Sequence, residues 1–193
     1  ASAGRHDEVV DATLGAPTGY VRVTGTNSKA NDYADGDGNK VHAQYHRYSA
    51  NVASGWTPDE STLAELSAIY SDGKAAYADR GMDGTKFLRT GAAVKLEKRH
   101  LNAWLSKLTA DVYTNSVDHI MDDQELRTPG TMGYANLKRD TTGIRAAAAL
   151  HTGENGLLEV GLDAMSTAHQ SRMAGTNGVY SAWVDDATIR QTG

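Results

Sequence analysis

The spacing of apolar residues predicts helices over most of the chain beyond residue 58. Val94, Leu101, Leu105, Leu108 and Val112 recur at intervals of seven, four, three and four, which places them on one face of a helix. Thr57-Pro58-Asp59-Glu60 combines a cap, a proline and two acids, a favourable helix start. Stretches ending at Gly81, Gly153 and Gly175 follow similar spacing. The predicted helices cover 59–78, 92–113, a short segment after Asn115, 141–151 and 156–174.

The first 58 residues have a different pattern. Residues 20–24 alternate between apolar and polar types and end at Gly25, which predicts a short strand. Residues 31–40 form a polar loop. Residues 41–52 fit both periods: Val41, Tyr45, Tyr48 and Val52 have helical spacing, whereas Val41, Ala43 and Tyr45 alternate as in a strand, and we favour the helix. A closing strand is predicted at 179–184, where it could pair with the strand at 20–24. We therefore predict a mainly α protein with a minor β element (α+β) and four to five helices.

This pattern divides the chain into two regions. Residues 1–58 are predicted to form a polar, β-containing N-terminal arm, and residues 59–193 a helical domain with a short C-terminal strand.

The composition predicts that this fold is only marginally stable as an isolated molecule. Leu, Val, Ile and Phe together supply 31 of 193 residues, whereas Ala alone supplies 28 and Gly 20. Burying a large aliphatic side chain contributes roughly 1.5–3 kcal/mol, and an alanine contributes much less. Chain entropy opposes folding by about 1–2 kcal/mol per residue whatever the side chain. We therefore expect either closely packed, alanine-faced helices or burial against other copies of the chain.

Several classes of protein are disfavoured by the same composition. The absence of cysteine excludes a disulfide scaffold and a thiolate zinc site. A net charge of −5 argues against a dedicated nucleic-acid binder. No apolar run approaches the roughly 20 residues of a membrane-spanning helix, so no membrane partner is expected. The chain also lacks GxSxG, P-loop and dinucleotide-binding motifs.

Two pairs of residues are candidate ligands for a divalent metal. His42 and His46 are four apart, and on a helix their rings would lie close enough to share an ion. Glu97 and His100 form an ExxH, the spacing used in helical bundles with carboxylate-bound metals. The alternatives are two surface histidines for the first pair and an ion pair of Glu97 with a neighbour such as Arg99 for the second. The main expectation is that no cofactor is bound.

Charged residues around two of the predicted helices are candidate subunit contacts. One group is acidic and the other basic, which would suit a head-to-tail interface. The alternative is that both groups are solvated faces. The acidic group is Asp118, Asp122 and Asp123, and the basic group is Lys95, Lys98 and Arg99.

These observations favour a structural subunit of a homo-oligomeric assembly, of the virion, capsid or filament type, without catalytic activity. Its expected partners are copies of itself and other proteins of the same assembly. The alternatives are a metal-dependent enzyme using His42 and His46 or Glu97 and His100, and a small protein-binding adaptor. The compartment is not fixed by the sequence; a soluble protein of a virion or of the cytoplasm is expected.

Overall fold

The computed structural model describes residues 4–153 and 156–193, and these form strands where the sequence predicted helices. The described residues contain no helix, and so none that could cross a membrane. The prediction of a mainly α fold with four to five helices is therefore wrong. The strands are β1 (His6–Ala16), β2 (Gly19–Ala30), β3 (Tyr33–Ala34), β4 (Lys40–Val41), β5 (Tyr45–Trp56), β6 (Thr62–Ala75), β7 (Asp83–Arg99), β8 (Leu105–Asp122), β9 (Tyr134–His151), β10 (Leu157–Ala174) and β11 (Val184–Thr192).

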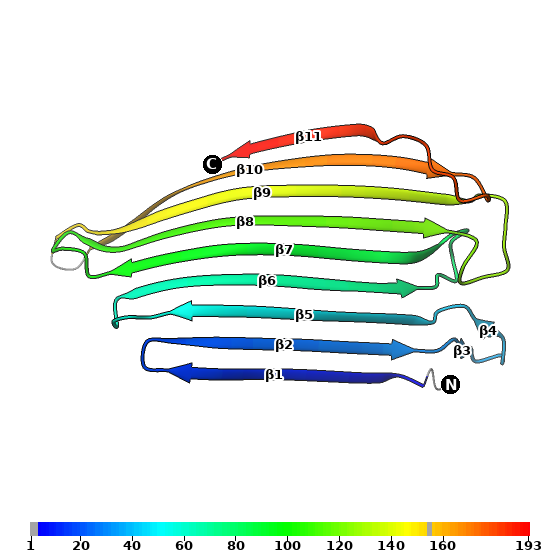
Figure 1. Ribbon diagram of the computed structural model, residues 1–193, viewed down its shortest axis with the longest axis horizontal. Coiled ribbons are helices and arrows are strands. Elements are labelled where there is room, and N and C mark those ends of the chain that lie inside the picture. The colour runs from blue at the N-terminus through cyan, green and yellow to red at the C-terminus, as the bar shows by residue number, and fades with distance from the viewer. Residues whose placement is uncertain (1–3, 154–155) are drawn as a thin grey trace.

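Nine of these strands form one antiparallel sheet in which neighbours in space are neighbours in sequence (Figure 1). The order is β1-β2-β5-β6-β7-β8-β9-β10-β11, and the short β3 and β4 pair with each other in the connection between β2 and β5. The predicted pairing of residues 20–24 with 179–184 is wrong. Residues 20–24 lie in β2, between β1 and β5, whereas β11 begins at Val184 on the opposite edge of the sheet.

The helical prediction failed because a spacing of four fits a strand as well as a helix. Alternate residues of a strand share a face, so positions four apart also share one. Leu108 and Val112 therefore lie on the same face of β8, with Ala110 between them. Alanine at such intermediate positions hides the alternation, since it is weakly apolar and a strong helix former. The run 146–149 is hidden in the same way within β9.

The predicted division between residues 58 and 59 falls in the connection between β5 and β6, which pair from Tyr45 with Ala75 to Trp56 with Ala64. The division itself stays a prediction.

The two ends of the sheet differ in the length of their connections. At one end, which we call the turn end, residues 17–18, 57–61 and 100–104 join successive strands. At the other end, the loop end, the connections are longer (Figure 1). They comprise 31–44, 76–82, 123–133 and 175–183.

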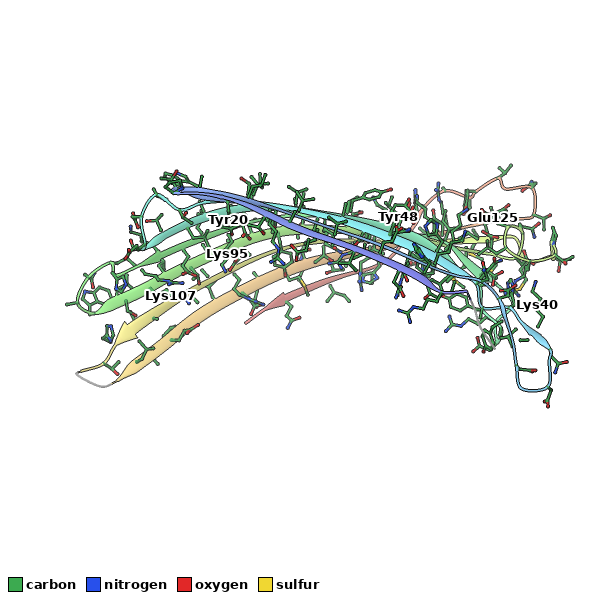
Figure 2. All side chains as sticks on the ribbon, turned by 90° about the horizontal axis from the view of Figure 1, so that it is seen from below. Tyr20, Lys40, Tyr48, Lys95, Lys107 and Glu125 are labelled. Atoms are coloured by element: carbon green, nitrogen blue, oxygen red, sulfur yellow. The ribbon has the colours of Figure 1, made fainter. Side chains whose placement is uncertain are left out.

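The sheet is a single bent layer, so the molecule has no apolar core between two layers (Figure 2). The labelled residues Lys107 and Tyr20 lie toward the turn end, and Lys40 and Glu125 lie at the loop end. The only buried apolar side chains among the described residues are alanines. The largest fully buried side chains are polar: Asp83, Asp122 and Asn136, all toward the loop end.

Candidate functional surface

One face of the sheet carries most of the large apolar side chains of the strands. The register of the strands places Leu66, Val94, Val112 and Ile144 in one row across β6 to β9, all on this side. Each is between 43% and 59% exposed, so none is covered by another part of the described chain. We call this the apolar face. Its exposed members are Val10, Leu14, Val21, Val23, Val52, Trp56, Leu66, Tyr70, Val94, Leu96, Leu108, Val112, Ile144, Leu158, Val160 and Leu162.

Aromatic and charged side chains border the apolar face at both ends. Trp56 lies at its turn end. Tyr48 and Tyr70 lie toward its loop end, with ring centroids 6.2 Å apart. Within β7, Lys86 and Lys98 enclose the apolar stretch that runs from Leu88 to Leu96. An apolar band is thus bounded by groups that favour contact with water.

The opposite face, which we call the polar face, carries a ladder of charges across five strands. Successive members stand directly opposite one another in the register, and their signs alternate. Direct opposition of unlike charges stabilises strand pairing. The members are Glu65, Lys95, Asp111, Arg145 and Asp163 on β6 to β10; we call them the charge ladder.

His119 is an unusual histidine on the polar face, close to the loop end of β8. Its ring stacks on Phe87 of β7 with centroids 4.5 Å apart. Its Nε2 is the only buried side-chain nitrogen or oxygen without a hydrogen-bond partner among the described residues. The residue lies beyond the loop-side border of the apolar band, and burial lowers the pKa of its imidazole. His119 therefore presents a neutral, unsatisfied nitrogen.

Two methionines lie close to His119 in the register. Met121 is two residues further along β8, so its side chain is on the same face. Ala135 of β9 stands between Met121 and Met173 of β10, which places both thioethers in one row. Imidazole and thioether are ligands that copper accepts, and thioether selects the soft Cu(I).

The loops are held together by one buried carboxylate at the start of β7. Both oxygens of Asp83 accept hydrogen bonds from Arg127, whose Nε lies 2.8 Å from Oδ2. His42 Nε2 lies 2.9 Å from Asp83 Oδ2, and the Tyr77 backbone N donates to Oδ1 at 2.9 Å. The hydrogen bonds from Arg127 and His42 outweigh burial and lower the pKa of Asp83 to about 2. We call Asp83, Arg127 and His42 the loop clasp, because they join the connections 31–44, 76–82 and 123–133.

The three acidic residues predicted as an interface belong to this ordered loop end. Asp122 is 1% exposed; its Oδ1 accepts from the backbone N of Gln124 and of Glu125, and its Oδ2 accepts from Thr85. Asp123 is 3% exposed and accepts from Met132 N and Gly133 N. Asp118 pairs with Lys86 at 2.6 Å. Their role as a subunit interface stays a prediction.

The predicted basic group is divided between the two faces of β7. Lys95 belongs to the charge ladder on the polar face. Lys98 is on the opposite face and donates to the hydroxyls of Thr62 and Ser61 at 2.6 and 2.7 Å. Arg99 donates to Glu97 at 2.6 Å. These residues lie on β7 toward the turn end, away from the acidic group at the loop end.

The structure does not assemble the predicted metal ligands into one site. His42 takes part in the loop clasp, whereas His46 lies on β5 with its Nε2 2.8 Å from Asn27 Oδ1. Glu97 is paired with Arg99, and His100 begins the turn after β7 with a φ of 54°. Among the described residues, no group of three or more His, Asp or Glu side chains could hold a metal ion. The metal prediction for these residues stays a prediction.

Sequence reasoning missed His119 and the charge ladder. His119 was not among the predicted metal ligands. The alternation of residues 107–115, with Lys107, Thr109, Asp111, Tyr113 and Asn115 on one side, was the signal that could have found the polar face.

One solved structure is very similar to this chain. It is described as the copper transporter OprC and is 38% identical in sequence, with a TM-score of 0.90. The match covers 99% of this chain and 32% of that chain, so this chain spans about a third of its length. No family model matches the sequence, and no curated protein matches it.

This likeness overturns the predicted function. The prediction of a helical, virion, capsid or filament subunit is wrong, because the fold is an all-strand sheet similar to part of a transporter. The prediction rested on the scarcity of bulky apolar residues. A single-layer sheet needs few of them, since only one face is apolar.

Proposed function

We propose that this chain forms part of the membrane-spanning wall of a copper transporter. The observation that carries the proposal is the separation of the two faces: large apolar side chains project from one side of the sheet and charged ones from the other. In a wall of this kind the apolar face contacts lipid and the polar face borders the path of the transported ion.

The dimensions of the apolar band support a membrane crossing. A tilted transmembrane strand needs about 9–11 residues. Residues 48–56 of β5, 88–96 of β7 and 108–116 of β8 have this length and lie within the aromatic and charged borders. These are the proposed spanning segments, and the rest of each strand extends beyond the lipid on the loop side. Aromatic side chains at both borders are typical of such walls.

The free edges of β1 and β11 imply further strands in the proposed wall. Backbone groups that lack hydrogen bonds are costly in lipid, where no water replaces them. The outer edges of β1 and β11 must therefore pair with other strands of the transporter. This proposal departs from the expectation of no membrane partner, which considered helical spans alone.

Copper, in this proposal, is the transported ion, and it meets His119, Met121 and Met173 on the polar face. The unsatisfied Nε2 of His119 supplies one ligand, and the thioethers supply soft ones. A path needs ligands that hold the ion and then release it, so an incomplete ligand set is suited to transport.

Copper uptake by lipid vesicles that contain the complete transporter, with this chain in its wall, tests the copper part of the proposal. His119→Ala and Met121→Leu should each reduce Cu(I) uptake about tenfold, whereas His151→Ala, at the turn end of β9, should leave it unchanged. Met121→Leu keeps the apolar volume, so its effect reports the thioether rather than packing. Equal uptake by all four proteins would refute a role for these ligands.

Single cysteines test the membrane part directly, because the chain has no native cysteine. In vesicles, Val112→Cys should react with a thiol reagent dissolved in the lipid, and Asn115→Cys with a water-soluble one. The two positions are three residues apart in β8 and lie on opposite faces. Rapid reaction of Val112→Cys with the aqueous reagent would exclude the proposed lipid contact.

A further inference from the structure

The polar face has a hollow between β2 and β8 that the copper proposal does not use. Its volume is about 440 Å³, within the range of small-molecule sites. Its floor is made of small side chains, including Ser67, Gly91 and Ala93. Two arginines, Arg22 and Arg89, line it, and no carboxylate does.

The two arginines differ in how their charges are balanced. Arg22 makes two hydrogen bonds with Asp11, at 3.0 and 2.5 Å, so its charge is neutralised within the sheet. Arg89 donates its Nε to the amide oxygen of Asn115 at 2.5 Å. It has no ion pair with any carboxylate among the described residues. Arg89 is therefore an exposed cation whose position is fixed by a neutral partner.

The row that contains Arg89 adds further positive charge. In the register, Val117 stands between Arg89 and Arg139, and His169 follows Arg139 on β10. Ser71 lies on the other side of Arg89. Two strand spacings, roughly 10 Å, separate the two arginines. Without an anion, this row of the polar face holds uncompensated positive charge next to the hollow.

A neutral donor stands beside Arg89 in the hollow. Because the Asn115 oxygen accepts from Arg89, the same amide presents its nitrogen as a donor. A guanidinium and an amide N–H group together can donate to an oxyanion.

We propose that this hollow binds a small oxyanion, a carboxylate or a phosphate, with Arg89 as its principal contact and Asn115 as a supporting donor. The proposal rests on the proposed function only in requiring that the polar face be open to water. Four residues of β8, roughly 13 Å, separate Asn115 from His119. The oxyanion site is therefore distinct from the copper ligands and can be tested without copper.

Calorimetric titration of the copper-free protein in lipid vesicles, with inorganic phosphate or with citrate, tests the proposal. The wild type should bind at least one of the two anions saturably in the millimolar range or below. Arg89→Ala should weaken binding about tenfold or more, because it removes a charge-assisted hydrogen-bond donor. Arg89→Lys should retain part of the affinity as a point charge.

Arg145→Ala is the matched control, since Arg145 is also an arginine of the polar face but does not line the hollow. It should bind the anion as the wild type does. Binding of phosphate alone or of citrate alone supports the proposal and identifies the class of anion. The proposal is overturned if no saturable binding is seen up to 10 mM, which corresponds to a binding free energy of roughly 3 kcal/mol. It is also overturned if the wild type and Arg89→Ala bind the anion equally well.

The His119→Ala variant separates this proposal from the copper proposal. It should reduce Cu(I) uptake about tenfold and keep anion binding. If the wild type does not bind the anion but copper uptake depends on His119, only the oxyanion proposal is wrong. If the anion binds but copper uptake does not depend on His119, only the proposal of the copper ligands is wrong.

Discussion

Asp111 of β8 lies directly opposite Arg145 of β9 on the polar face of the sheet. Arg145 also faces Asp163 on its other side, and Asp111 faces Lys95. The charge ladder thus places every internal member between two residues of opposite sign. A shift of register by one residue would move every member of one strand to the other face, so the ladder favours a single register.

Reversing the charge at the middle of the ladder should destabilise the sheet. Arg145→Glu replaces two favourable pairs with two repulsive ones and should cost about 1–2 kcal/mol. Urea unfolding of the reconstituted protein measures this. Arg139→Glu is the matched control, because Arg139 faces Val117 and His169 rather than acids. Equal losses in the two variants would show that the ladder contributes nothing specific.

A charge on the apolar face should impair folding into lipid far more than one on the polar face. Val112→Arg places a guanidinium in the middle of the apolar band, where the expected cost is about 2–4 kcal/mol. Thr109→Arg puts the same side chain on the polar face of the same strand and should cost less than about 1 kcal/mol. The folded fraction in vesicles of defined composition is the readout. A similar loss in both variants would contradict the proposed lipid contact of Val112.

Tyr113 packs directly over Gly143 of the neighbouring strand. A Cβ at Gly143 would lie 2.3 Å from Cζ of the tyrosine ring, so the ring requires glycine there. Gly143→Val should therefore destabilise the sheet by about 1–3 kcal/mol through overpacking. In a Tyr113→Ala background the same substitution should be nearly neutral, since valine suits a strand. A double-mutant cycle by urea unfolding measures the coupling, and additive effects would count against this packing.

The loop clasp should fail at acid pH. The pKa of Asp83 is lowered to about 2 in the folded protein, from an ordinary value of 3.8, mainly by hydrogen bonds from Arg127 and His42 acting against burial. A lowered pKa contributes stability that is present above about pH 4 and lost as the pH falls toward 2. Limited acid proteolysis should therefore cleave the connections 76–82 and 123–133 increasingly over this interval.

Asp83→Asn is the variant that isolates this effect. It should make the same connections sensitive at neutral pH, with a loss on the order of 3 kcal/mol because Arg127 loses its buried partner. Its cleavage should then change little between pH 4 and pH 2. Asp35→Asn, in an exposed turn of the 31–44 connection, is the control. Wild-type cleavage that does not change with pH would show that Asp83 does not hold the loops.

The sequence by itself determined the supply of apolar, charged and small side chains from which the sheet is built. It predicted little of the geometry of the sheet. Alternation at 20–24 identified part of β2. The scarcity of bulky apolar residues led to the prediction of a subunit of a homo-oligomeric assembly, which is wrong. The intervals of Leu108 and Val112 could not decide between helix and strand, because four is compatible with both periods. Alanines at 110 and 146–149 hid the alternation of apolar and polar positions that would have favoured a strand.

Only the tertiary structure decided which residues meet. The charge ladder joins residues 65, 95, 111, 145 and 163, whose separations in sequence have no common period, because strand pairing and not local spacing sets the register. The same pairing stacks His119 on Phe87 and places Met121 and Met173 on either side of Ala135 in one row. No single segment of the sequence brings these residues together. In the sequence, Asp122 and Asp123 stand in an acidic stretch that is typical of a solvated surface. In the structure both are buried, and backbone amides of the loops donate hydrogen bonds to them. A carboxylate at a strand end can accept from amides that have no partner in the sheet.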